Sequence, residues 1–98
     1  MTLAFLIVRT ESVVALMGEL ERKDERKFKK VRKTLGLLSQ DPKYPGLNSH
    51  KRESEKAPAG EDIWESYVEN NTPSAWRVFW FYGPDSGTIT VFAITPHP

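Results

Sequence analysis

The C-terminal segment from Ser74 to Pro98 constrains the fold most strongly, because two strand-like runs flank a compact turn signal. The first run reads Ser-Ala-Trp-Arg-Val-Phe-Trp-Phe-Tyr, the turn reads Gly-Pro-Asp-Ser-Gly, and the second run reads Thr-Ile-Thr-Val-Phe-Ala-Ile-Thr. Aromatic and β-branched runs on either side of such a turn are typical of a β-hairpin. We therefore expect two antiparallel strands at this end of the chain.

Alternation along the first run assigns its side chains to two faces of a sheet. One face carries Trp76, Val78, Trp80 and Tyr82, and the other carries Arg77, Phe79 and Phe81. The first face can supply a hydrophobic core. The second can present a guanidinium group and aromatic rings to a ligand, which makes this lone arginine the sharpest local feature of the sequence.

Length and composition bound the class of protein. A chain of 98 residues corresponds to one domain, 1–98, with a small core. The absence of cysteine excludes disulfides, zinc–thiolate sites and thiol nucleophiles, and it is consistent with the reducing cytoplasm. No apolar run approaches the ~18 residues of a membrane span, and segment 3–8 lacks the flanks of a signal peptide. We expect a cytoplasmic protein without a membrane partner.

The charges are distributed unevenly. Residues 1–49 carry ten Lys or Arg against six Asp or Glu, whereas residues 50–98 carry four against seven. Eight of the ten basic residues lie between Arg22 and Lys33. Such a cluster can meet phosphates or an acidic protein segment, although a solvated helix face is the simpler interpretation.

The N-terminal half predicts a strand and two helices. Segment 3–8 is a short apolar run that fits a buried strand. Thr10 or Ser12 can cap a first helix, and a second helix is expected over about 25–39. Apolar residues recur at helical spacing in both, at Val13, Val14, Leu16, Met17 and Leu20 and then at Phe28, Val31, Leu35 and Leu38. We expect an antiparallel helical hairpin, with one helix bent near Lys23 as the alternative.

The remaining segment predicts a long loop and a further strand. Asp41-Pro42 ends the second helix, and 43–60 is expected to be loop, with a partial strand near 47–51 as an alternative. Strand character returns at 63–68, followed by a turn at 70–73. The order β-α-α-β-β-β predicts an α+β fold in which two N-terminal helices pack on one face of a mostly antiparallel four-stranded sheet.

This order, together with local motifs, resembles the RelE/ParE superfamily of bacterial toxins. The motifs are Leu-Gly-Leu-Leu-Ser-Gln-Asp-Pro-Lys-Tyr-Pro-Gly-Leu at 35–47, His50-Lys51, the arginine-bearing Ala-Trp-Arg-Val-Phe-Trp at 75–80, and a near-terminal His97. The resemblance covers essentially the whole chain and implies a single RelE/ParE-like domain.

The resemblance implies two activities. RelE-like members cut mRNA in the ribosomal A site without a metal, whereas ParE-like members bind DNA gyrase, and both are held inactive by an antitoxin. We expect the toxin component of a type II toxin–antitoxin system, acting as an endoribonuclease on ribosome-bound mRNA without a cofactor or metal. The alternatives are a non-catalytic gyrase-binding toxin or inactive relative and, less favoured, a housekeeping RNA-binding domain that uses the basic helix.

Metal-independent cleavage needs a base for the 2′-hydroxyl, cations for the phosphorane and an acid for the 5′-oxygen. Arg77 matches the phosphate-binding arginine of the family and can clamp the scissile phosphate; the alternative is a strand arginine paired with Glu65 or Glu69. His97 matches a near-terminal histidine of several members, and imidazole titrates near neutral pH. Lys51 is the expected supporting cation.

A further set of residues is expected to bind RNA. His50 and Arg52 can approach the backbone, and Tyr67, Phe79 and Phe81 can stack on bases or, alternatively, form a groove for the antitoxin. One departure stands out: RelE carries lysines on the strand before the arginine strand, whereas this chain has Glu65 and no lysine there. Either His97 and a carboxylate perform the chemistry, or the protein does not cleave RNA.

Overall fold

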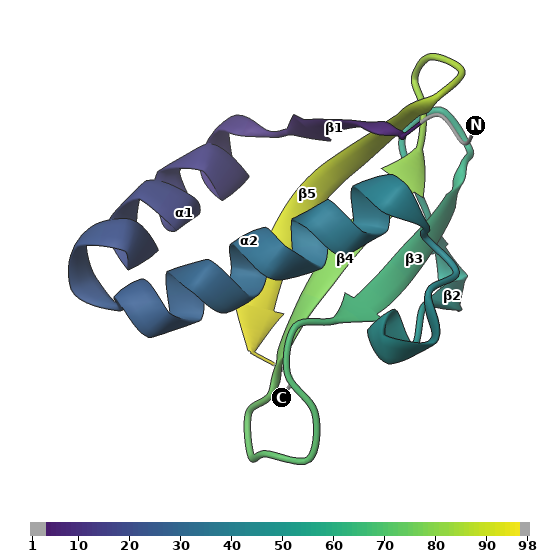
Figure 1. The fold of residues 1–98 in the computed structure, drawn as a ribbon. Coiled ribbons are helices and arrows are strands. Elements are labelled where there is room, and N and C mark those ends of the chain that lie inside the picture. The colour runs from purple at the N-terminus through teal and green to yellow at the C-terminus, as the bar shows by residue number, and fades with distance from the viewer. Residues whose placement is uncertain (1–3, 97–98) are drawn as a thin grey trace.

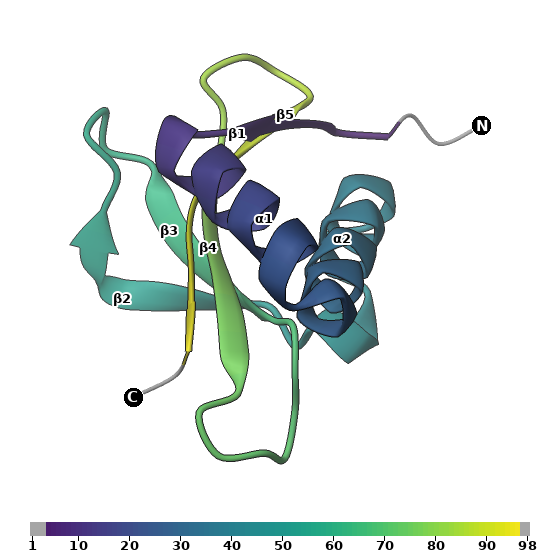
Figure 2. The same ribbon diagram turned by 90° about the vertical axis from the view of Figure 1, so that its left-hand side faces the viewer.

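Two helices lie against one face of a five-stranded sheet in the computed structural model, which describes residues 4–96 (Figures 1 and 2). The strand order is β1-β5-β4-β3-β2, with β1 parallel to β5 and the other neighbours antiparallel. The elements are β1 (Leu6–Arg9), α1 (Glu11–Lys23), α2 (Glu25–Gln40), a 3-10 turn (Pro45–Leu47), β2 (His50–Lys56), β3 (Asp62–Tyr67), β4 (Trp76–Tyr82) and β5 (Thr88–Pro96). Within residues 4–96, neither helix is long and apolar enough to cross a membrane.

The α+β class is confirmed, but the sheet has five strands rather than the predicted four. The additional strand, β2, lies inside the segment predicted as loop. Its sequence, His-Lys-Arg-Glu-Ser-Glu-Lys, has no apolar alternation, so periodicity could not reveal it. Pairing with β3 forms it instead, and charged residues are common on the edge strands of sheets.

The helical hairpin is also confirmed, because the chain reverses at Asp24. This residue ends α1 and begins α2, and its carboxylate accepts a hydrogen bond from the backbone N–H of Lys27 at 3.1 Å. An aspartate at this position satisfies one of the free N–H groups of the first helical turn. The two helices consequently pack side by side on the sheet (Figure 2).

The hydrophobic core fills the space between the helices and the sheet. Alternation along β4 places Val78 and Trp80 in this core, both almost fully buried, as the sequence predicted. Helix residues Val13, Met17, Leu20, Val31, Leu35 and Leu38 and strand residues Ile89, Val91 and Ile94 complete the core. We call this side of the sheet the covered face and the opposite side, which carries Arg77, the open face.

Candidate functional site

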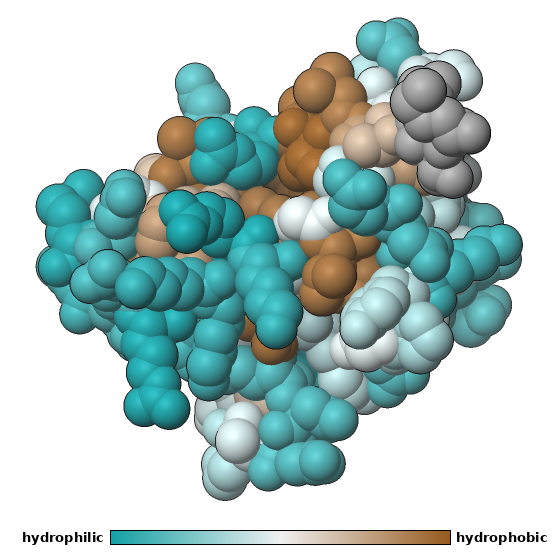
Figure 3. All heavy atoms as spheres, viewed as in Figure 1, coloured by the Kyte–Doolittle hydropathy of each residue, from teal (hydrophilic) through white to brown (hydrophobic). Residues whose placement is uncertain are grey.

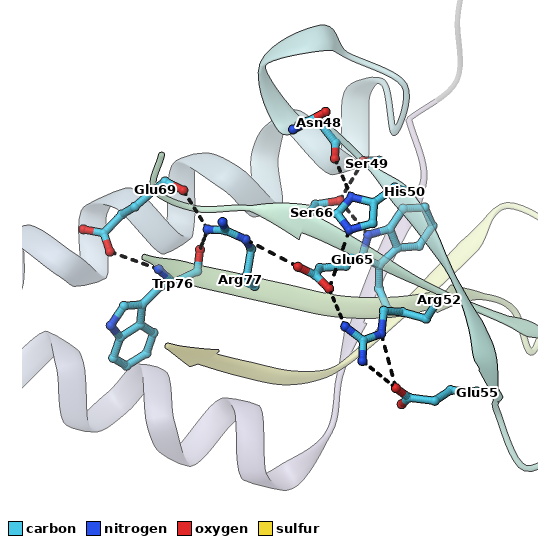
Figure 4. Close-up of polar contacts among 11 residues, drawn as sticks. Asn48, Ser49, His50, Arg52, Glu55, Glu65, Ser66, Glu69, Trp76 and Arg77 are labelled. Carbon is cyan, nitrogen blue, oxygen red and sulfur yellow. Dashed lines mark hydrogen bonds and ion pairs between the residues drawn. The ribbon is translucent and has the colours of Figure 1, made fainter. Parts of the chain in front are cut away.

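The pairing of β2, β3 and β4 brings charged side chains together on the open face. His50 pairs with Glu65 and Glu65 with Phe79, while Tyr67 pairs with Arg77 in the neighbouring row. Residues that are paired or two apart on adjacent strands lie on one face and within contact distance. We define the open-face cluster as His50, Arg52, Glu65, Tyr67 and Arg77, most of which Figure 4 shows.

Arg77 is held in a fixed position at the centre of this cluster. Its Nη1 donates hydrogen bonds to the backbone carbonyls of Glu69 at 2.9 Å and Trp76 at 3.2 Å (Figure 4). Its guanidinium carbon lies 3.6 Å from the ring centroid of Tyr67, and the residue is only 9% exposed. No hydrogen bond within residues 4–96 uses Nη2. The guanidinium is therefore anchored along one edge and has donor capacity left at the other.

Glu65 is the buried carboxylate of the cluster, with 3% exposure. It accepts a hydrogen bond from Nη1 of Arg52 at 2.9 Å and lies 3.4 Å from Nε of Arg77. Arg52 is oriented by a second carboxylate, Glu55, at 2.7 Å. Two guanidinium groups thus compensate a charge that would be strongly destabilising if buried alone. This is the Glu65 pairing that the sequence offered as the alternative role of Arg77.

His50 lies at the edge of the cluster and is half exposed. Its Nδ1 is 3.0 Å from the carbonyl oxygen of Asn48 and therefore carries the proton, because a carbonyl only accepts. Its Nε2 is 3.7 Å from Glu65 (Figure 4). Asn48 adopts the left-handed conformation that ends the 3-10 turn, and this bend aims its carbonyl at the ring. An imidazole fixed in this way can exchange a proton at Nε2.

Lys51 lies away from Arg77. It pairs with Trp64 across the β2–β3 ladder, so its side chain projects from the covered face. The ammonium lies 3.4 Å from Asp62 and 5.7 Å from the Trp64 ring centroid. The expected grouping of Arg77, His97 and a lysine is thus not formed by Lys51, and His97 lies outside the described residues.

The predicted aromatic residues lie on the open face, but two of them support charged neighbours. The Tyr67 ring lies between Arg77 and the edge of His50, and Phe79 lies 5.6 Å below the guanidinium of Arg52. Phe81 packs against Phe92 at 5.9 Å. Phe81 therefore belongs to a separate, apolar part of the face.

Glu69 is a residue that sequence reasoning noted only as a partner for Arg77. Its carboxylate accepts hydrogen bonds from Lys27 at 2.7 Å and Lys30 at 3.1 Å and from the backbone N–H of Trp76 at 3.2 Å. The Lys27 hydrogen bond, with smaller help from Lys30 and Trp76 and against the effect of burial, lowers the pKa of Glu69 to about 2. Two charges of the basic helix are thereby used to hold the β3–β4 connection, whose carbonyl anchors Arg77.

No metal centre is formed by the described residues, because His, Asp and Glu side chains do not gather in groups of three or more within 4–96. The chemistry available to the open-face cluster is that of guanidinium, carboxylate and imidazole groups.

Comparison with known proteins identifies the fold. No family model and no curated protein matches the sequence. The structure is similar to a chain of the archaeal RelE–RelB complex from Pyrococcus horikoshii, with 12% identity, 96% of each chain covered and a TM-score of 0.69. It is also similar to the YoeB/ParE toxin from Agrobacterium tumefaciens, with 14% identity, 95% of this chain and 99% of that chain covered and a TM-score of 0.70.

A third structure, the YoeB dimer from Staphylococcus aureus, has 12% identity, covers 97% of this chain and 99% of its own, and gives a TM-score of 0.63. The chain therefore has the fold of the RelE/ParE-like toxins, as the sequence resemblance predicted.

Proposed function

We propose that this protein is the toxin of a toxin–antitoxin pair and that it acts in the cytoplasm as a metal-independent endoribonuclease on ribosome-bound mRNA. The shared fold supports the assignment as a toxin. The observation that carries the nuclease assignment is the convergence of an anchored Arg77, a compensated Glu65 and a half-exposed His50 on one open face.

The proposed reaction assigns a role to each group. The 2′-hydroxyl attacks the adjacent phosphorus, its proton passes to a base, and the 5′-oxygen leaves after taking a proton from an acid. Cleavage yields a 2′,3′-cyclic phosphate and a 5′-hydroxyl. Arg77 binds the phosphate through Nη2 and stabilises the phosphorane charge, and Arg52 adds a second positive charge. His50 transfers a proton at Nε2, and Glu65 orients both cations.

His97 is the proposed second proton-transfer group. Its role stays a prediction from the sequence. A cleavage reaction of this kind needs one acid and one base, and His50 supplies only one of them. Loss of activity in His97→Ala, with unfolding unchanged, is the expected result.

The apolar part of the open face suits the antitoxin. A cavity of about 380 Å³ is lined there by Ile63, Phe81 and Phe92. The adjacent strand β1 exposes Leu6 (67%) and Val8. Figure 3, which views the molecule from the helix side, shows hydrophobic residues along β1 at the edge of the sheet. Exposed apolar surface of this kind is typical of an interaction site. We propose that an apolar segment of the antitoxin covers it, next to the open-face cluster.

One observation favours a second function. Arg77 is largely buried and Glu65 compensates its charge, so a phosphate must compete with an internal carboxylate. A non-catalytic toxin of the gyrase-binding kind, or an inactive relative, does not need Arg77 to bind a phosphate, so this arrangement would not impair it.

Expression in a bacterial host separates these functions. The wild-type protein is expected to arrest growth and to cut transcripts at sites that ribosomes occupy. Arg77→Ala is expected to abolish both effects. Lys51→Ala is the matched control, because it removes a cation from the covered face. Growth arrest with DNA damage and intact transcripts would favour the gyrase-binding alternative, and growth without arrest would favour the inactive relative.

A further inference from the structure

A second concave feature lies on the covered face, on the opposite side of the sheet from Arg77. It is a cavity of about 390 Å³ between the 42–49 connection and strands β3 and β4. Its walls include Lys43, Tyr44, Trp64, Trp80 and Tyr82. Cavities of roughly 300–1,000 Å³ with aromatic walls and few polar groups are typical of small-molecule binding sites.

The inner wall of this cavity is rigid and aromatic. Trp64 and Trp80 are stacked, with ring centroids 5.7 Å apart and an interplanar angle of 16°. Tyr82 stands nearly perpendicular to both, at 80° to Trp64 and 84° to Trp80. The Trp80 indole N–H donates to the Ser66 hydroxyl at 2.8 Å, which fixes the buried ring.

Ser49 extends this polar support to the cavity wall. Its hydroxyl lies 2.7 Å from that of Ser66 and donates to the carbonyl of Pro42 at 2.9 Å. The 42–49 connection, which forms the outer wall, is thus tied to the sheet. The arrangement of the Trp64, Trp80 and Tyr82 rings around the cavity is consequently already formed in the free protein and does not depend on a bound ligand.

The outer wall adds an exposed ring and a cation. Tyr44 is 45% exposed. A Cβ atom on residue 46 would lie 2.8 Å from Cε2 of Tyr44, so glycine at this position leaves room for the tyrosine ring. Lys43 forms no ion pair within residues 4–96. A flat aromatic ligand that carries a negative charge matches this combination of ring faces and one available ammonium group.

We propose that this cavity binds a nucleobase of a single-stranded RNA, with the base against Tyr44, Trp64 and Tyr82 and the attached phosphate at Lys43. The proposal rests on the proposed function for its choice of an RNA strand over a free nucleotide. The protein would then bind RNA at two places, with the phosphate to be cut on the open face and another nucleotide of the same strand on the covered face. Binding of this nucleotide would fix the position of the RNA strand along the protein surface.

Titration followed by nitrogen-15 NMR tests the proposal, because each of the three tryptophans has its own indole N–H signal. Adenosine 5′-monophosphate and the trinucleotide ApApA are the probes. Both are expected to shift the signals of Trp64 and Trp80 and to leave that of Trp76 in place, and ApApA is expected to bind more tightly. Tyr44→Ala should weaken binding of both probes about tenfold, as expected for the loss of one stacking ring.

Lys43→Ala should weaken adenosine 5′-monophosphate but not adenosine, and Lys33→Ala is the matched control on α2. Unchanged Trp64 signals at millimolar probe, or binding insensitive to Tyr44→Ala, would overturn the proposal. Binding of the mononucleotide but not of ApApA would overturn the choice of an RNA strand, and shifts produced only by a proline-rich peptide would reassign the cavity to a protein ligand.

In this design, a result can refute either the nuclease proposal or the cavity proposal without refuting the other. Arg77→Ala is expected to abolish growth arrest while leaving the nucleotide-induced shifts unchanged. Growth arrest without any nucleotide binding would refute the cavity proposal alone. Nucleotide binding by a protein that never cuts RNA would refute the nuclease alone.

Discussion

The two faces of the same sheet differ in what their side chains do. Strand β4 contributes to both, with Val78 and Trp80 buried under the helices and Arg77 and Phe79 on the open face. The covered face is dominated by apolar and aromatic side chains that stabilise the fold, whereas the open face gathers a carboxylate, two guanidinium groups and an imidazole. Strict alternation thus lets one strand serve stability and chemistry at successive positions.

The largest expected effect comes from the open face. His50→Ala should lower the rate of mRNA cleavage about 100-fold or more, the range for losing a general acid or base. Stability should change little, because the ring is half exposed. Cleavage of ribosome-bound mRNA by purified protein and urea unfolding measure the two effects. A cleavage rate within about threefold of wild type, well short of the 10²-fold expected, would remove His50 from the proposed reaction.

A substitution on the covered face should show the opposite pattern. Leu38 is fully buried in the core, so Leu38→Ala should lower the free energy of unfolding by about 2–5 kcal/mol. The folded fraction should cleave at the wild-type rate. Chemical denaturation and an activity assay at low temperature provide the check. A cost well below about 2 kcal/mol, the lower end of the range for such substitutions, would mean that Leu38 is packed less tightly than the structure shows.

The Glu69 carboxylate links the basic helix to the site and should make stability depend on pH. Its pKa falls from an ordinary 4.5 to about 2 in the folded protein, so the ionised form stabilises the fold fully above about pH 4.5 and progressively less toward pH 2. Wild type should lose about 1–2 kcal/mol more than Glu69→Gln between pH 5 and pH 3. Urea unfolding at the two pH values gives the comparison, and equal losses would contradict this assignment.

The smallest effect is expected at Lys51. Its ion pair with Asp62 is exposed and on the covered face, and exposed pairs contribute about 0–1 kcal/mol. Lys51→Ala should therefore change the free energy of unfolding by no more than about 0.5 kcal/mol relative to the wild type. The rate of mRNA cleavage should be nearly unchanged. A large loss of cleavage in a fully folded variant would return Lys51 to the catalytic set.

The sequence predicted the layers of the fold because periodicity carries that information. The stripe from Phe28 to Leu38 and the alternation from Trp76 to Tyr82 each identify a buried face. It gave β2 only as a partial strand near 47–51, an alternative to a loop, because a charged edge strand forms through pairing with β3 and has no hydrophobic pattern of its own. The second helix, expected over about 25–39, spans Glu25–Gln40 in the structure.

The site was predicted less completely than the fold. Arg77 could be assigned to the open face by alternation, but its carbonyl anchors and its contact with Glu65 depend on strand register. Register also separates Lys51 from its neighbours His50 and Arg52, since adjacent residues on a strand point to opposite faces. Because the sequence predicted a loop over these residues, it could not assign their side chains to faces of a sheet. His50, Lys51 and Arg52 were therefore all expected at the site.

Single-turnover cleavage of ribosome-bound mRNA by Arg77→Ala tests the central claim most directly. The double variant Arg77→Ala/Glu65→Gln serves as the control for folding, because it leaves no buried carboxylate with a missing partner. We predict that wild type yields 2′,3′-cyclic phosphate ends and that both variants are slower by about 10²–10³-fold, the usual cost of losing one transition-state donor. Cleavage by either folded variant at the wild-type rate, or none by the wild type, would contradict the account.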